Sequence, residues 1–474
     1  MSGKKISRRR FLQSAAIASG GLMLAACAVP ASTSPAQQPA QPAAEQKPAE
    51  APAAAGKTKL AYWHSWTEQW EEMTKFVADS FNQKYPEFQA EEIVVPGAEL
   101  MTKLLSAVAS GKPPDVVTIY SAINIPSLAE QDAIVALDDI GGQDDIAKAK
   151  DWFHPAVLDL GNYNGKLWGL SYWQQTSCLA WNKKIFKEVG LDPEKPPTTI
   201  PELDAMAEKL TKTEGNQIVR MGHMPAYYQM WAAAWDAKFY DAENRKVTAD
   251  DPKLIEMFEW MASYSKKYDV TKVQAFEQSL ASERAGTLDP FISGKIAIHE
   301  VGGPWKIGDF KKYAGPDFEY GITPAANPPG MTGVSTYSYG DFTVVPKGAP
   351  DPVASWQFVK YTGGLGGTIE DYFKVLTWGN RPINVPVTTK ILDYEPFKKL
   401  VADNPGFQEM IDMFLKGDRV GLPPKMPVGT FYADRLSAAR DKIRLLEATP
   451  AEALKQVTEE VQKELDNFYK KQGK

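Results

Sequence analysis

The sequence predicts an α/β protein whose folded body divides into more than one lobe. After residue 57, strand-like and helical segments alternate in the order β-α-β-α-β, which favours parallel strands in an open sheet covered by helices. A body of about 400 residues is longer than one hydrophobic core usually organises. All 13 tryptophans lie in this body, and aromatic side chains at such density fill a core or line a ligand cleft.

The first five elements follow from the spacing of apolar residues. Residues 59–63 and 93–95 are short apolar runs typical of strands, and 115–119 is a continuous apolar run typical of a buried strand. Between them, 68–85 and 99–110 place apolar side chains at helical spacing, and each ends before a glycine or a proline. We therefore expect three parallel strands connected by two helices.

Two aromatic residues follow these predicted strands. Trp66 comes after the first strand, and Tyr120 comes directly after the third. Ligands of open α/β sheets bind beyond the carboxyl ends of the strands. Both side chains are therefore candidate ligand contacts.

Residues 1–27 have the features of an export signal. Ser7-Arg8-Arg9-Arg10-Phe11-Leu12 resembles the twin-arginine signature, and the apolar run that follows is shorter than the roughly 20 residues of a membrane span. Leu24-Ala25-Ala26-Cys27 resembles the lipobox of bacterial lipoproteins. We expect export and a lipid on Cys27 that anchors the protein to the outer face of the cytoplasmic membrane.

The segment 28–56 consists almost entirely of Ala, Pro, Gln, Ser and Glu. Such a composition does not bury enough apolar surface to fold, so we expect a disordered linker. The second cysteine, Cys178, lies among apolar residues and is expected to be a buried small side chain. With a lipid on Cys27, no internal disulfide is expected.

Charge and motifs exclude several functions. The net charge of −6 argues against nucleic acid as a partner. The four histidines do not have the spacing of a zinc site, and we expect no metal or other cofactor. The sequence contains neither a Gly-x-Ser-x-Gly elbow nor a phosphate-binding P-loop, so any ATP hydrolysis would need another protein.

Six motifs of the body occur in a recognisable order. They are Ser110-Gly111-Lys112-Pro113-Pro114-Asp115-Val116-Val117, Leu128-Ala129-Glu130 with Leu137-Asp138, Asn164-Gly165-Lys166-Leu167-Trp168-Gly169-Leu170, Leu179-Ala180-Trp181-Asn182-Lys183-Lys184-Ile185-Phe186, Pro196-Pro197-Thr198-Thr199, and Phe291-Ile292-Ser293-Gly294-Lys295-Ile296-Ala297-Ile298 with Gly302-Gly303-Pro304-Trp305. In this order they resemble the motifs of the extracellular solute-binding proteins of sugar ABC transporters, the family that includes maltose-binding protein. After the third motif, Ser171 stands where that family usually has proline.

The resemblance implies a two-lobed type II periplasmic-binding-protein fold with a ligand cleft between discontinuous lobes. The implied lobes are 57–170 plus 336–381 and 171–325 plus 385–474, with crossovers near Leu170, 326–336 and 381–385. It also implies that the protein is a monomer and is not an enzyme. It is expected to bind a sugar by hinge closure and to deliver the sugar to the permease subunits of an ABC transporter.

The chemistry of sugars narrows the choice of site residues. Hydroxyl groups need planar polar side chains, and the C–H faces of the rings stack on aromatic side chains. Resemblance to family positions adds Gln175 after the first crossover, an aromatic segment with Tyr228 and Trp231, and Trp305, which matches a tryptophan that packs on the sugar. The full set of candidates is Trp66, Tyr120, Gln175, Tyr228, Trp231, Trp305, Tyr339, Asp341, Arg381 and Tyr432.

Two alternatives stay open at this point. A glycoside-processing enzyme would need two opposed carboxylates in the cleft, and Asp341 is the acidic candidate that we identify. A binding protein for a non-sugar solute, such as a phosphorylated polyol, would favour several Arg or Lys in the cleft. The sequence indicates Arg381 for that role.

Overall fold

The computed structural model describes residues 57–473, apart from 281–285, 316 and 379. The predicted export signal, the lipid-bearing Cys27 and the linker 28–56 lie outside the described residues. Within the described part, no helix is long and apolar enough to cross a membrane.

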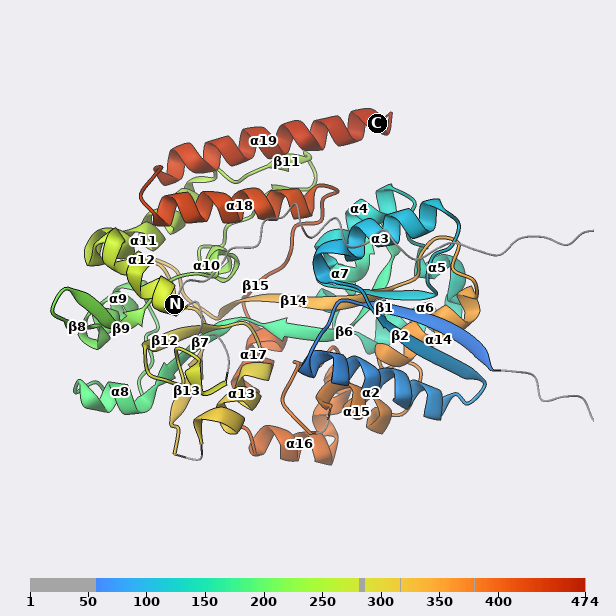
Figure 1. Cartoon of the computed structure of the whole chain (residues 1–474), viewed down its shortest axis with the longest axis horizontal. Coiled ribbons are helices and arrows are strands. Elements are labelled where there is room, and N and C mark those ends of the chain that lie inside the picture. The colour runs from blue at the N-terminus through green and yellow to red at the C-terminus, as the bar shows by residue number, and fades with distance from the viewer. Residues whose placement is uncertain (1–56, 281–285, 316, 379, 474) are drawn as a thin grey trace, which may run out of the picture. The chain divides into compact units, whose positions relative to one another are not determined.

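A first sheet of six strands organises one half of the described body (Figure 1). Its path is β15-β14-β3-β1-β2, and β6 pairs with β14. The strands are β1 (Thr58–His64), β2 (Phe88–Val94), β3 (Val116–Ile119), β6 (Gly169–Thr176), β14 (Ser335–Val344) and β15 (Arg419–Gly421).

The predicted order of the first five elements of the body is confirmed. β1 pairs in parallel with both β2 and β3, and the helices α2 (Gln69–Lys84) and α3 (Gly97–Ala109) connect them. β2 begins five residues before the predicted strand, because its first half is too polar for an apolar-run criterion. The antiparallel β14 lies beside β3 although it comes from far along the chain.

A second sheet organises the other half. Its path is β13-β7-β12-β9-β8, in which β12 and β9 are parallel and the remaining pairs are antiparallel. The strands are β7 (Cys178–Asn182), β8 (Lys212–Glu214), β9 (Gln217–His223), β12 (Ile296–Val301) and β13 (Tyr320–Thr323). Short hairpins are formed by β4 (Asn162–Tyr163) with β5 (Lys166–Leu167) and by β10 (Tyr240–Asp241) with β11 (Lys246–Val247).

Two long strands run between the sheets. β6 and β14 pair from Ser338 with Thr176 to Val344 with Gly169, and they extend from one half of the body toward the other in Figure 1. The chain passes from β6 into β7 of the second sheet at Ser177 and returns from β13 into β14. These passages give the body two α/β lobes. The lobe boundaries expected from the sequence stay a prediction.

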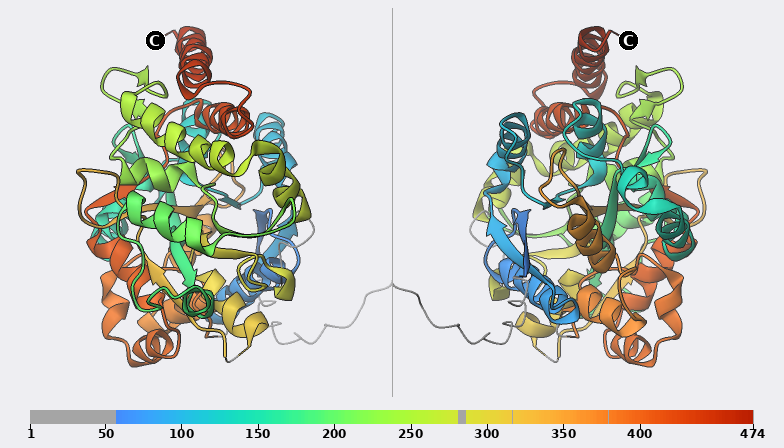
Figure 2. Two further views of the ribbon diagram at one scale, coloured as in Figure 1. Left: turned by 90° about the vertical axis from the view of Figure 1, so that its left-hand side faces the viewer. Right: turned by 90° about the vertical axis from the view of Figure 1, so that its right-hand side faces the viewer.

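Helices cover the outsides of both sheets, as the end views in Figure 2 show. Around the first sheet lie α2, α3, α4 (Ile125–Glu130), α5 (Leu137–Ile140), α6 (Gly142–Trp152), α7 (Pro155–Gly161), α14 (Pro352–Thr362) and α15 (Ile369–Thr377). Around the second lie α8 (Lys183–Glu188), α9 (Ile200–Leu210), α10 (Tyr228–Ala234), α11 (Pro252–Tyr268), α12 (Val270–Ser279), α13 (Trp305–Asp309), α18 (Gly429–Arg444) and α19 (Pro450–Lys471). The described residues also form α16 (Glu395–Ala402), α17 (Phe407–Lys416) and the short helices η1 (Ala122–Asn124), η2 (Gly286–Leu288), η3 (Phe310–Ala314) and η4 (Thr389–Asp393).

Local signals in the sequence explain several boundaries. β7 ends at Asn182, whose side-chain oxygen accepts the N–H of Ile185 and starts α8. Thr199 and Glu202 form a reciprocal capping box at the start of α9. Cys178 is fully buried as predicted, and burial raises the pKa of its thiol well above the usual range.

Candidate ligand-binding cleft

A cavity of about 420 Å³, here called the tyrosine pocket, lies between elements of the two lobes. One wall follows β3, the floor comes from Ser177 and β14, and the other wall comes from the start of α10 and from α18. Its lining residues are Tyr120, Ser121, Ile123, Asn124, Ser177, Tyr227, Gln229, Tyr337, Tyr339, Thr430 and Ala433.

Tyrosine rings dominate this pocket. Tyr120 and Tyr227 are 54% and 41% exposed, unusually high for large aromatic side chains in a folded body. The ring of Tyr120 lies 6.3 Å from that of Tyr339, which stacks on Tyr337 at 5.8 Å. Exposed ring faces beside hydroxyl groups suit a ligand that has both C–H faces and polar groups.

The polar groups of the tyrosine pocket are uncharged. Asn124 and Gln229 supply side-chain amides, and none of the described lining residues is Asp or Glu. The Thr430 hydroxyl donates to the Asn124 side-chain oxygen at 2.9 Å, which joins the β3 side of the pocket to α18. Neutral donors and acceptors of this kind recognise sugar hydroxyls without attracting ions.

Asp341 lies behind the first wall rather than in the open cavity. It is 4% exposed, and the Ser121 backbone and the Trp66 side chain are the nearby donors that favour its charged form. Burial raises the pKa of Asp341 well above its usual value, while those two donors oppose the rise. The residue therefore supports Trp66 and the loop after β3.

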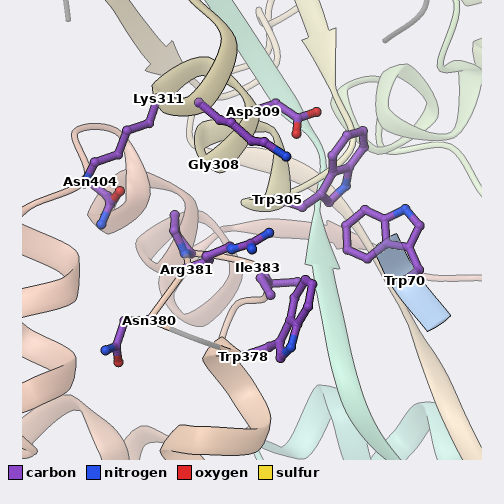
Figure 3. Close-up of a pocket in the computed structure, with 12 residues that line it drawn as sticks. Trp70, Trp305, Gly308, Asp309, Lys311, Trp378, Asn380, Arg381, Ile383 and Asn404 are labelled. Atoms are coloured by element: carbon purple, nitrogen blue, oxygen red, sulfur yellow. The ribbon is translucent and has the colours of Figure 1, made fainter. Parts of the chain in front are cut away.

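A second cavity, here called the tryptophan pocket, measures about 300 Å³. Figure 3 shows Trp70, Trp305 and Trp378 on one side, and Lys311, Asn404 and Arg381 on the other. The lining residues are Trp70, Trp305, Gly308, Asp309, Lys311, Lys312, Trp378, Asn380, Arg381, Pro382, Ile383 and Asn404.

A series of ring contacts connects the two pockets. The Trp305 ring is 6.1 Å from Trp70, and Trp70 is 6.1 Å from Trp66. Trp66 in turn lies 6.0 Å from Tyr120 and 4.8 Å from Trp173 of β6. The aromatic surface therefore runs from one pocket to the other along the interface of the lobes.

Five of the ten predicted site residues take part in this surface. Tyr120 and Tyr339 line the tyrosine pocket, Trp305 and Arg381 line the tryptophan pocket, and Trp66 lies between them. Whether each contacts a ligand stays a prediction.

Gln175 is buried at the crossover. Its amide N–H donates to the Asn384 side-chain oxygen at 2.8 Å and to the Ile383 carbonyl. Its own amide oxygen is buried without a hydrogen-bond partner among the described residues, and it points at Gly303. The side chain therefore ties β6 to the segment 383–385 and is not part of either pocket lining.

Three predicted residues lie in the core instead of the cleft, which corrects their assignment. Tyr228, Trp231 and Tyr432 are at most 2% exposed and pack in the hydrophobic core of the second lobe. The indole N–H of Trp231 donates to Glu300, and the hydroxyl of Tyr432 donates to the Phe239 carbonyl. Their faces are fully covered by protein and do not accept a sugar ring in this structure.

Sequence reasoning missed several lining residues. Tyr227 and Gln229 flank Tyr228 but point into the pocket, because α10 begins at Tyr228 and turns its neighbours to other faces. Trp70 lies near the start of α2 and Trp378 follows the end of α15. They are far apart in the sequence but line the same pocket. For Tyr227, its position beside the predicted Tyr228 is the sequence feature that could have indicated a place in the pocket.

Glu300 holds the turn that presents Tyr227. Its carboxylate accepts the backbone N–H groups of Ala226 at 2.9 Å and Tyr227 at 2.5 Å, and the Trp231 indole N–H at 2.5 Å. Burial raises the pKa of Glu300 to about 7, although the three donors oppose the rise. The imidazole of His223 lies 3.6 Å away, and burial lowers its pKa to about 4.

The described residues contain no cluster of three or more His, Cys, Asp or Glu side chains that could hold a metal ion. The arrangement is therefore one of ring faces, amides and hydroxyls in the tyrosine pocket, with added cations in the tryptophan pocket.

Comparison with known proteins identifies a family. A family model for bacterial extracellular solute-binding proteins matches residues 77–408. A maltotriose-binding protein of Pyrococcus abyssi is 25% identical over 65% of this chain and 62% of its own length. An sn-glycerol-3-phosphate-binding periplasmic protein of Brucella melitensis is 24% identical over 74% of this chain and 79% of its own.

Solved structures agree with this assignment. CpMnBP1 with mannotriose bound superposes with a TM-score of 0.73 at 28% identity and covers 85% of this chain and all of its own. The sugar-binding protein MalE of Xanthomonas citri shares the fold, with a TM-score of 0.69 at 17% identity over 86% of this chain and 98% of its own. The predicted two-lobed binding-protein fold is confirmed. With a family model that matches most of its length, the chain belongs to the bacterial extracellular solute-binding protein family.

Proposed function

We propose that the protein binds an oligosaccharide in the cleft and delivers it to an ABC transporter. The observation that carries the proposal is the tyrosine pocket, where exposed Tyr120 and Tyr227 rings stand beside neutral amides and hydroxyls supplied from both lobes. This combination is suited to stacking on sugar rings and to hydrogen bonding with their hydroxyls. The mannotriose bound to CpMnBP1 supports a sugar as the ligand class.

The mechanism proposed is closure of the lobes over the ligand. A sugar that touches Tyr120 on one wall and Tyr227 on the other gains contacts in the closed form that the open form lacks. The sugar therefore shifts the equilibrium toward closure, and the closed form docks on the permease.

We propose binding rather than catalysis. Glycoside hydrolysis needs two carboxylates on opposite sides of the bond, about 5 to 9.5 Å apart depending on mechanism. In the described residues the tyrosine pocket has no lining carboxylate, and Asp341 is buried behind its wall. Both observations favour a receptor that leaves the sugar intact.

The test is calorimetric titration of the purified protein with manno- and malto-oligosaccharides of two to four units, followed by chromatography of the recovered sugar. Micromolar or tighter binding with intact sugar is the expected result. Shortened products would support an enzyme instead, and no binding by any oligosaccharide would contradict the proposal.

We also propose that the mature protein is a lipid-anchored monomer. The support is the lipobox-like Leu24-Ala25-Ala26-Cys27 behind a twin-arginine-like segment. Cys27→Ser should move the protein from the membrane fraction into the soluble fraction and leave sugar affinity unchanged. A loss of affinity on that change would show that anchor and binding body are not independent.

A phosphorylated polyol is a second candidate ligand. The relatives that bind sn-glycerol 3-phosphate support it, as do the cations that line the tryptophan pocket. The cleft nevertheless offers two pockets of about 300 and 420 Å³, and a series of aromatic ring contacts extends from one to the other. That length favours a chain of sugar units over a small polyol.

A further inference from the structure

The tryptophan pocket carries a net positive charge, opposite in sign to the net charge of the whole protein. The chain has a net charge of −6, yet this pocket is lined by Lys311, Lys312 and Arg381 with Asp309 as its one lining carboxylate among the described residues. A cavity with an excess of cations attracts an anionic group.

The nearby carboxylates are engaged by other lysines. The buried ammonium of Lys306 pairs with Asp289 at 2.5 Å and lies 3.8 Å from Asp309. Asp403 pairs with Lys399 at 2.8 Å. The hydrogen bond from Lys399 lowers the pKa of Asp403, and the more distant charge of Lys311 lowers it further. In the described part of the chain, no carboxylate lies within 4 Å of the Lys311, Lys312 or Arg381 charge.

Arg381 is held in place by its surroundings. Its guanidinium lies over the Trp378 ring, 4.4 Å from the centroid, and its backbone N–H donates to the Thr377 carbonyl at 2.8 Å. Stacking covers the face of the guanidinium and leaves the N–H groups at its edge free to bind a carboxylate or phosphate in a bidentate manner.

The backbone around Arg381 is strained. Trp378 and Asn380 have positive φ angles of 24° and 62° although neither is glycine. Such conformations persist where the surrounding structure enforces them, and they cluster at ligand sites. Here they bring Trp378 and Arg381 to the same pocket.

Three indoles complete the site. Trp70 and Trp305 meet edge to face at 6.1 Å, and Trp378 lies below them in Figure 3. The indoles of Trp70 and Trp305, beside the stacked Arg381 guanidinium, match a pyranose ring that carries a negative group. We propose that the tryptophan pocket binds an anionic sugar unit at one end of an oligosaccharide whose other units occupy the tyrosine pocket. The proposal rests on the sugar-binding function proposed above.

The test titrates the purified full-length protein with neutral mannotriose, a uronic-acid trisaccharide, mannose 6-phosphate and glycerol 3-phosphate. We expect the uronic-acid or the phosphorylated sugar to bind at least about 10-fold more tightly than its neutral counterpart. Added NaCl should weaken that preference, because the pocket is open to solvent. The arm that shows the preference identifies the anionic group as carboxylate or phosphate.

Arg381→Gln should lower the affinity for the anionic sugar by at least about 10-fold more than it lowers the affinity for neutral mannotriose, because the guanidinium is the group that would bind the negative charge. The matched control is Arg245→Gln. Arg245 also stacks on an aromatic ring, with 4.3 Å to the Tyr469 centroid, but it lies in neither pocket. It should change no affinity.

The outcomes separate the two proposals. Equal affinity for neutral and anionic sugars in both wild type and Arg381→Gln would overturn the anionic subsite and leave sugar binding intact. Tight binding of glycerol 3-phosphate with no binding of any sugar would overturn the sugar-binding function itself.

Discussion

Tyr120 is the most exposed aromatic side chain of the cleft. Because 54% of it is exposed, truncation removes little packing from the folded protein. We predict that Tyr120→Ala changes the free energy of unfolding by less than about 0.5 kcal/mol. It should weaken sugar affinity about 10- to 100-fold, as expected for an aromatic contact that carries much of the binding energy.

Leu288→Ala is the matched control for this prediction. Leu288 is 55% exposed, like Tyr120, but lines neither pocket. Titration calorimetry and thermal denaturation of both variants give the comparison. Unchanged affinity in Tyr120→Ala would remove this residue from the site.

Glu300 predicts a measurable pH dependence. Burial raises its pKa from 4.5 to about 7 in the folded protein, so the native state holds this proton more tightly than the unfolded chain does. The resulting stabilisation is complete below about pH 4.5 and is lost as the pH rises through about 7. His223, with a pKa lowered to about 4, gives the opposite trend.

Glu300→Gln removes this titration while His223 stays in place. Between pH 4.5 and 8, wild type should lose up to about 3 kcal/mol of unfolding free energy relative to the variant. The loss of an acceptor oxygen adds a constant offset that does not depend on pH. Urea denaturation at several pH values measures the difference, and parallel curves would contradict the assigned pKa.

At the scale of elements, the spacing of apolar residues correctly predicted the helices and strands whose formation depends on neighbouring residues in the sequence. β1, α2, β2, α3 and β3 follow from apolar spacing. β14 was not predicted as a partner of β3, because antiparallel insertion from a distant segment leaves no mark on either strand.

The same limit applies to the site. Tyr120 follows a strand and was predicted from that position, whereas Tyr227 and Tyr228 differ only in the phase at which α10 begins. A one-residue difference in helix start decides which ring faces the pocket and which fills the core. Lys311 and Lys312, in the helical segment η3 (Phe310–Ala314) after α13, come together with Arg381 only in the folded pocket.

Gly303, in the turn between β12 and α13, packs closely against Gln175 at the crossover. A Cβ added at Gly303 would lie 1.7 Å from the side-chain oxygen of Gln175, which Asn384 holds at 2.8 Å. We predict that Gly303→Ala lowers the unfolding free energy by about 1 to 3 kcal/mol through overpacking. Thermal or urea denaturation measures the change.

Gly308→Ala is the control for stability. Nothing lies within 4 Å of a Cβ at Gly308, which is inside α13, so this change should stabilise the helix by up to about 1 kcal/mol. If both variants lost the same stability, the close approach at Gly303 would not be the cause.

At the scale of the whole molecule, the closure that we propose involves contacts that cross between the lobes. The Thr430 hydroxyl donates to Asn124 at 2.9 Å, from α18 to the segment after β3. Opening of the cleft would have to break this bond. It therefore stabilises the closed arrangement of the lobes even without ligand, by about 0.5 to 1.5 kcal/mol if it is typical of protein hydrogen bonds.

Thr430→Val removes the hydroxyl and keeps the shape of the side chain. The ligand-free protein should then populate open forms more, which small-angle scattering measures as a larger radius of gyration. Sugar affinity should fall about 2- to 10-fold, because the sugar must supply the closure energy that the bond provided. Thr458→Val, which removes a hydrogen bond to Asp250 within the second lobe, should change neither measurement. A direct ligand contact by Thr430 would lower affinity but leave the ligand-free radius unchanged, so scattering without sugar decides whether this bond acts through closure.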